Sequence, residues 1–240
     1  MKAFFYTLYL KSKLDIKSAE LLITYYLVPL LFFAVMGAVF TSINPESKET
    51  LIASMSIFAI TMGAFIGTPS GLIQYFSNDM RKTFKCAGIP LRTIVTTTLI
   101  SGFINLAIVS GIIYFIAPIA FGAEKPQNTT LHVLGMAIFL FVSLLAGITL
   151  GLYAKSPSKL TMVSQLVFLP SMMLSGIMFP SDMLPKPLEY IGYIFPATNT
   201  MHILTIDSTE IRNYVFLGII FAITVILIVL RLRKYRFEDS

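Results

Sequence analysis

The chain has 240 residues, of which 56% are hydrophobic and 12% are charged, and its formal net charge is +6. Soluble domains carry about 25% charged residues, and a chain of this size cannot hide so much apolar surface from water, so the composition excludes a soluble globular protein. A single cysteine, Cys86, excludes an internal disulfide and a cysteine-clustered metal site. We therefore expect a protein whose solvent is lipid.

The first predicted element is an amphipathic helix near the N-terminus. Lys11, Lys13 and Lys17 alternate there with apolar residues such as Leu14 and Ile16. The apolar side chains would lie on the inner membrane surface while the lysines reach lipid phosphates. The apolar run is short and broken by lysines, which is not typical of a secretory signal.

Six stretches without charge are long enough to cross about 30 Å of hydrocarbon as helices, which takes about 20 residues each. In chain order these predicted spans are 21–40, 51–73, 93–121, 132–154, 161–179 and 213–230. The strands of a membrane barrel would alternate apolar and polar residues, and these stretches do not. The sequence predicts an all-α, polytopic membrane protein with six transmembrane helices in a single domain, residues 1–240.

The basic residues predict the orientation of these spans. Placing both chain ends in the cytoplasm puts all but four of the eighteen Lys and Arg residues on the inner side. The four that remain outside are Lys48, Lys125, Lys186 and Arg212. This distribution satisfies the positive-inside rule. The net charge is therefore a topology signal, and no basic stripe indicates nucleic acid as a partner.

The only inner loop of any size follows the second span. In QYFSNDMRKTFKCAGIPLRT, residues 74–93, Phe76, Met80 and Phe84 recur at every fourth position between charged residues. This spacing predicts a short amphipathic helix over about 75–88, which Gly88 and Pro90 end. Two interpretations remain open. The helix either lies against acidic lipid or is a docking site for a soluble partner.

The segment after the fifth span, SGIMFPSDMLPKPLEYIGYIFPATN, is apolar but interrupted by four prolines. An additional crossing here would place the basic C-terminal RLRKYR outside, against the charge bias. The segment, about 180–206, must therefore leave and return on the same side. Pro180 would stop the fifth helix, a short helix can start at Pro187, and Pro196 would end it. We expect one or two short re-entrant helices in the outer leaflet between spans five and six.

The sequence contains no phosphate-binding loop, no HExxH and no GxSxG, and no acidic residue or lysine lies in the middle of a predicted span. His132 is expected at the membrane interface. His202 lies near Asp207 and Glu210, either as a metal or proton site or on a solvated rim. The chain thus has no evident catalytic centre or ion-coupling group. Energy for uphill transport would have to come from a separate ATPase on the inner loops.

Together these elements resemble the type-2 ATP-binding cassette (ABC) permeases, the membrane subunits of bacterial drug, antibiotic and polysaccharide exporters. The resemblance covers essentially the whole chain. After span five it rests on Pro170, Ser175, Gly176, Ile177, Phe179, Pro180, Leu184, Pro185, Pro196 and Thr198. In the inner helix Asp79, Arg81, Thr83 and Pro90 occupy the family's positions, and Lys82 stands where glycine is commoner.

The resemblance implies a permease that is not itself an enzyme, with no catalytic residue and no cofactor or metal of its own. Two copies of a cytoplasmic ABC ATPase would bind ATP and Mg²⁺, and a second permease half, identical or homologous, would complete the transporter. The ATPase-coupling residues would be Asp79, Arg81, Lys82, Thr83, Phe84 and Pro90. The re-entrant helices, with Pro180, Pro185, Pro187 and Pro196, would cap the translocation path.

The family also implies that spans two and five line that path. Candidates are Thr61, Met62 and Phe65 on span two and Gln165, Met172, Met173 and Ser175 on span five. Methionine-rich walls adapt to varied apolar ligands, but small and flexible residues also serve ordinary helix packing. The expected substrate is an amphipathic drug, antimicrobial peptide or lipid. The expected location is the bacterial cytoplasmic membrane, with both termini cytoplasmic.

Two other functions are compatible with parts of the pattern. One is a secondary, ion-coupled efflux carrier, which the lack of a mid-span carboxylate disfavours. The other is a non-transport membrane assembly protein or lipid-modifying enzyme, for which no catalytic pair is visible.

Overall fold

The structure is a computed structural model, and it describes residues 17–43, 47–76, 90–178, 184–205 and 210–238, with 11, 13, 80 and 86. Among these residues all regular structure is helical, which confirms the predicted all-α class. The helices are α2 (Ala19–Leu22), α3 (Val28–Ile43), α4 (Ser47–Met62), α5 (Thr68–Tyr75), α7 (Leu91–Phe121), α8 (Thr129–Tyr153), α9 (Pro157–Leu174), α10 (Lys186–Gly192), α11 (Pro196–Thr205) and α12 (Ile211–Glu238). Two π-helical turns, η1 (Ile23–Leu27) and η2 (Gly63–Gly67), join α2 to α3 and α4 to α5.

Five helical segments of the described chain are long and apolar enough to cross a membrane. They are Ala19–Ile43, Ser47–Ile73, Leu91–Phe121, Thr129–Tyr153 and Ile211–Tyr235. Each contains or overlaps one of the predicted spans. The remaining predicted span, 161–179, corresponds to α9, which has 18 residues and ends at Leu174. Beyond it the chain bends through Gly176, whose φ of 82° is a conformation that favours glycine.

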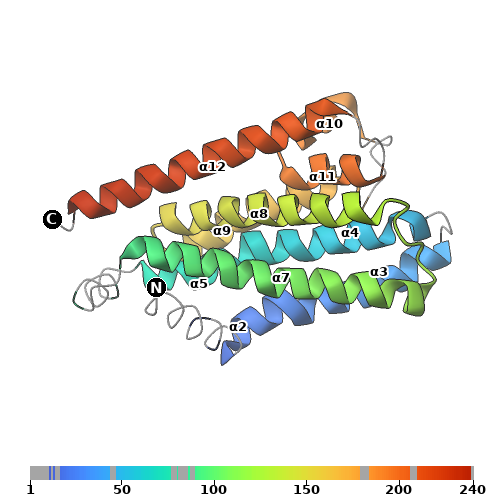
Figure 1. Cartoon of the computed structure of the whole chain (residues 1–240), viewed down its shortest axis with the longest axis horizontal. Coiled ribbons are helices and arrows are strands. Elements are labelled where there is room, and N and C mark those ends of the chain that lie inside the picture. Colours follow the sequence, from blue (N-terminus) through green and yellow to red (C-terminus); the bar gives the residue numbers. More distant parts are fainter. Residues whose placement is uncertain are drawn as a thin grey trace.

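The long helices run side by side, and their ends fall into two groups (Figure 1). At one end lie the start of α7, the ends of α5, α8 and α12, and the start of α9. Ten basic residues that the structure describes belong to this end, namely Lys11, Lys13, Lys17, Arg92, Lys155, Lys159, Arg231, Arg233, Lys234 and Arg236. We call it the basic end. The opposite end carries Lys48, Lys125, Lys186 and Arg212 together with α10 and α11.

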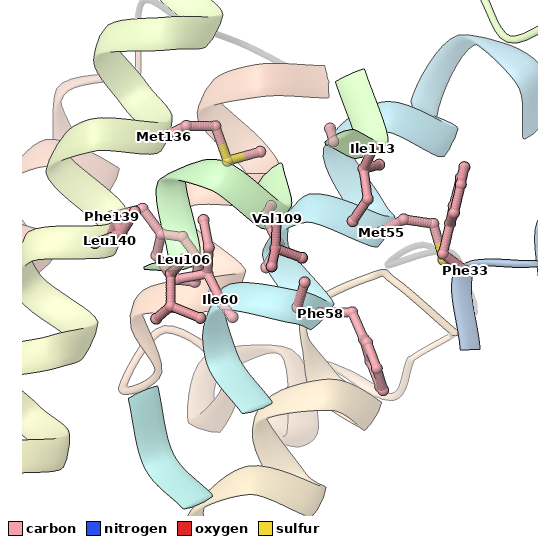
Figure 2. Close-up of a cluster of buried hydrophobic side chains, with 14 of the residues drawn as sticks. Phe33, Met55, Phe58, Ile60, Leu106, Val109, Ile113, Met136, Phe139 and Leu140 are labelled. Carbon is pink, nitrogen blue, oxygen red and sulfur yellow. The ribbon is translucent and has the colours of Figure 1, made fainter. Parts of the chain in front are cut away.

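The second segment is the centre of the bundle. Its most apolar stretch is 83% buried inside the chain, against 17% for the segment in α12. Every residue of α4 from 51 to 61 is buried. Figure 2 shows Met55, Phe58 and Ile60 of α4 among side chains from the helices that surround it. A helix that is apolar on all faces needs apolar surroundings on every side, and for α4 the other helices of the chain provide them.

Glycines allow α8 to approach this central segment closely. A side chain at Gly147 of α8 would overlap the backbone carbonyl oxygen of Ala64 in η2. One turn further, a Cβ at Gly151 would lie 3.2 Å from the Cα of Pro69. Gly147 and Gly151 form a small-xxx-small pattern, which in membranes lets two helix backbones pack in contact. The α8 backbone is thus fitted against η2 and the start of α5.

Candidate functional site

The two π-helical turns face each other across the first two segments. A Cβ at Gly67 of η2 would lie 2.6 Å from Cε1 of Tyr25 in η1, so the tyrosine ring occupies the space that the glycine leaves. The Tyr25 and Thr68 hydroxyl oxygens are 3.0 Å apart, and Thr68 Oγ1 donates to the carbonyl oxygen of Gly63, 3.1 Å away. Since the Thr68 proton goes to Gly63, Tyr25 donates to Thr68. π-Turns inside helices are frequent at functional sites.

Helix α5 follows the π-turn η2 in the chain and leads to the basic end and to the predicted coupling segment. Of the predicted coupling residues, Asp79, Arg81, Lys82, Thr83 and Phe84 lie outside the described residues. Pro90 is described and is the exposed, extended residue before α7, with φ −71° and ψ 139°.

The end of α5 is tied to both ends of the described chain. Lys11 Nζ lies 4.9 Å from the centre of the Tyr75 ring, which is a cation–π distance. The buried ring of Phe76 lies 5.6 Å from that of Tyr235 in α12. A displacement of the segment after Phe76 would therefore reach α5 and α12 together.

The predicted path residues divide into two groups. Thr61, Phe65, Met172 and Ser175 are buried inside the chain. The hydroxyls of Thr61 and Ser175 donate to carbonyl oxygens of their own helices, Ile57 at 2.7 Å and Met172 at 3.2 Å, and so offer no proton to a ligand. Gln165 and Met173 of α9 are exposed, and Met62 is half-buried. Only these last three can line a path along the surface of this chain.

The predicted cap consists of two short helices. Pro185 precedes α10 and Pro187 lies in its first turn, as the sequence predicts. Pro196 was expected to end a helix, but it is the first residue of α11, and α10 ends earlier, at Gly192. Proline fits a first turn because its missing N–H needs no partner there. Pro180 lies outside the described residues.

Helix α11 is enclosed by the bundle rather than laid on it. Every residue from Pro196 to Ile203 is buried. Asn199 links α11 to the end of α10, because its Nδ2 donates to the carbonyl oxygens of Tyr193, at 2.8 Å, and Phe195, at 3.0 Å. Thr198 Oγ1 donates to the carbonyl oxygen of Leu174 at 3.4 Å, which holds α11 to the end of α9.

These contacts give a prediction for Asn199. Replacing it by leucine keeps the volume but leaves two buried carbonyl oxygens without the side-chain donor. The free energy of unfolding is expected to fall by about 2–4 kcal/mol, at about 1–3 kcal/mol per unsatisfied buried group. Thermal unfolding of the purified chain measures this, with Asn128→Leu, whose side chain caps α8 at an exposed site, as the control. A smaller loss for Asn199→Leu than for Asn128→Leu would contradict the assignment.

A charged network joins α10 to the start of α12. Arg212 Nη2 donates to Tyr193 Oη at 2.6 Å and lies 2.8 Å from Glu210 Oε1, while its guanidinium carbon lies 4.3 Å from the centre of the Tyr193 ring. Burial raises the pKa of Tyr193 above its ordinary value of 10.0, and Arg212 opposes this only in part. The phenol therefore stays protonated and donates to Glu189 Oε1 at 3.4 Å.

Both histidines are buried inside the chain. His202 is 8% exposed and its ring lies 5.5 Å from that of Tyr193, so it is not on a solvated rim. His132 is 5% exposed, with its ring 5.8 Å from that of Tyr114. Among the residues that the structure describes, no three His, Cys, Asp or Glu side chains gather closely enough to hold a metal ion.

A comparison with known protein families tests the family resemblance that the sequence motifs indicated. The family model described as ABC-2 type transporter matches residues 4–206, which include every described element from α2 to α11. The chain belongs to the ABC-2 type transporter family. A search of curated proteins returned no match. As a member of this family, the chain is the membrane domain of an ABC transporter, in agreement with the resemblance that the sequence motifs indicated.

Proposed function

We propose that this ABC-2 chain is the permease half of an ATP-driven exporter of amphipathic compounds. A second half, identical or homologous, would complete the translocation path, and two cytoplasmic ABC ATPase subunits would bind ATP and Mg²⁺ and supply the work. The basic end would face the cytoplasm, by the positive-inside rule, so that both chain ends lie inside a bacterial cytoplasmic membrane.

The observation that carries this proposal is the position of α5. It connects the segment 77–89, where we place the ATPase contact, to the π-turn pair and so to the most buried helix of the bundle. The backbones of α8 and η2 touch at Gly147 and Ala64, so a displaced α5 must move against a fixed neighbour. Nucleotide-driven force on the inner segment would turn α5 about η2 and rearrange the helices.

A sixth crossing by α9 completes the permease half. Its 18 residues span about 27 Å at 1.5 Å per residue, close to the thickness of the hydrocarbon. With α9 crossing, α10 and α11 begin and end at the opposite end of the bundle. They would form the re-entrant cap, and the buried position of α11 supports this, since irregular backbone at that depth must pack against protein.

The exposed side of α9 supports pairing with a second half. Its large apolar residues Met162, Leu166, Leu169 and Met173 are 62%, 60%, 56% and 51% exposed and recur at helical spacing. Gln165 lies on the same helix, and Met62 reaches the surface from α4. An apolar stripe with one amide and adaptable methionines suits an amphipathic substrate between two halves.

An ion-coupled carrier is not favoured by any observation on the described helices. Their Asp, Glu and Lys residues lie near helix ends, where they cannot bind a coupling ion at the bilayer centre.

Substituting Phe84 by glutamate tests the proposed ATPase contact. A charge in an apolar docking position is expected to weaken association with the ATPase subunit about tenfold, equivalent to about 1.4 kcal/mol, and to reduce ATP-driven export to a similar degree. The measurement is the binding of the purified permease to the proposed ATPase subunit, together with export in vesicles. Arg81→Glu is expected to act in the same direction.

Gln127→Glu, an exposed change at the opposite end, is the control and is expected to leave both properties unchanged. Full ATP-driven export by the Phe84→Glu chain would refute the contact. Export that ignores ATP but stops when the proton gradient is dissipated would refute the proposed energy source.

A further inference from the structure

A groove of about 470 Å³ lies at the basic end, where α8 ends and α9 begins, against the face of α12. Its apolar wall is formed by Leu150, Leu160, Val163 and Leu227, and its rim by Lys155 and Lys159. Helices α9 and α12 both pack on α8, so the groove is a channel between two helices with a third as its floor. It does not include the exposed path residues Gln165, Met173 and Met62.

Tyr153 fixes one wall of the groove. Its Oη donates to the carbonyl oxygen of Leu227 at 3.1 Å and so bridges α8 to α12. The Arg231 guanidinium carbon lies 5.1 Å from the centre of the Tyr153 ring and 4.6 Å from that of Tyr235. Arg231 Nε donates to the carbonyl oxygen of Leu152 at 3.0 Å, which holds this cation beside the groove.

The rim carries positive charge without a counter-ion. The side chains of Lys155 and Lys159 are exposed, and neither contacts a carboxylate among the residues that the structure describes. Arg231 is committed to one carbonyl through Nε, and its two Nη groups have no acceptor in the described part of the chain. An apolar wall with cations at its rim matches a molecule that has a hydrocarbon chain and an anionic head.

We propose that this groove binds one anionic phospholipid of the surrounding bilayer, with an acyl chain along Val163 and Leu227 and the phosphate between Lys155 and Lys159. Val163 is six residues into α9, about 9 Å from its start, and Leu227 lies within the apolar segment of α12. A soluble peptide could not reach that depth, whereas a lipid already lies there. Basic pockets between transmembrane helices on the cytoplasmic side are suited to anionic headgroups.

The chain offers a clean reporter, since it contains no tryptophan. A single tryptophan replacing Val163, which is 41% exposed, would report contact with a brominated lipid by loss of fluorescence. Val229→Trp, 44% exposed and about 200° around α12 from Leu227, is the matched reporter outside the groove. The full-length chain is reconstituted in phosphatidylcholine containing brominated phosphatidylglycerol or, in parallel, the same fraction of brominated phosphatidylcholine.

At Val163→Trp, brominated phosphatidylglycerol is expected to quench well beyond its mole fraction, while at Val229→Trp it should follow the mole fraction. Adding Lys155→Gln and Lys159→Gln to the Val163→Trp chain is expected to lower the relative binding constant about fivefold per lysine and about 25-fold together. Lys125→Gln with Lys186→Gln, at the opposite end, should leave it unchanged. All four lysines are exposed, so replacing them should not disturb the fold. Melting temperatures check that each variant is folded.

Equal quenching by the two brominated lipids at Val163→Trp would overturn the proposal. So would an excess that persists after both groove lysines are replaced, or an equal excess at Val229→Trp. The experiment needs neither the ATPase nor a transported compound. Its outcome is therefore independent of the Phe84→Glu test of the proposed function.

Discussion

Gly147→Ala is expected to lower the free energy of unfolding by about 3 kcal/mol or more, at the upper end of the range for overpacked cores. The new methyl group would overlap the carbonyl oxygen of Ala64, which is backbone and cannot rotate away as a side chain would. The helices α8 and α4 must then separate, and the Gly151 contact with Pro69 is lost with them. For a chain of this size the melting temperature should fall by about 6–12 °C, measured in detergent.

Two other glycines provide matched controls for Gly147. A Cβ at Gly111 in α7 or at Gly218 in α12 would have no neighbour within 4 Å. Alanine there removes only the backbone freedom of glycine, so Gly111→Ala and Gly218→Ala are expected to stabilise the chain by up to about 1 kcal/mol. A Gly147→Ala chain as stable as these controls would show that α8 and η2 are not in backbone contact.

Thr68→Val is expected to have the second largest effect, because it removes the centre of a buried hydrogen-bond chain. The change keeps the shape of the side chain but leaves Gly63 without its hydroxyl donor and Tyr25 without its acceptor. The free energy of unfolding should fall by about 2–3 kcal/mol, at about 1 kcal/mol or more for each disrupted buried group. Under the proposed function, ATP-driven export should fall further than the loss of folded protein explains.

Tyr25→Phe tests the bond from Tyr25 to Thr68 separately from the bond from Thr68 to Gly63. It removes the hydroxyl that donates to Thr68 and keeps the ring, so it should cost about 1 kcal/mol. The double variant should cost less than the sum of the two single variants. Thr96→Val is the control, since Thr96 is exposed and bonds only to carbonyl oxygens of its own helix, Arg92 and Thr93. Additive losses for Tyr25→Phe and Thr68→Val would mean that the two hydroxyls do not interact.

Run length and charge were sufficient to predict the helices that cross the bundle. Uncharged stretches of 18 residues or more have few solutions in lipid other than helices, and the five membrane-length helices of the described chain overlap five of the six predicted spans. The ends were predicted less well. Pro196 starts a helix where one was expected to end, because proline is equally suited to the residue after one helix and to the first turn of the next.

The π-turn pair could not be predicted from local pattern. The stretch GAFIGTPS, residues 63–70, has glycines but not the lysine of a phosphate-binding loop, so the sequence alone assigns these glycines no role. Their role depends on Tyr25, about 40 residues earlier in the chain, whose ring fills the space beside Gly67. The network of Tyr193 and Arg212 was missed for the same reason, since its members come from different helices and share no periodicity.

The way α4 is enclosed restricts where specificity can change. Its residues 51–61 are all buried inside the chain, so a change there alters folding before it can alter which compounds are recognised. The outward residues of α9, which have no such neighbours, can vary at little cost in stability. Under the proposed function, variants selected for a new drug resistance spectrum should therefore accumulate on α9 and leave the central helix unchanged.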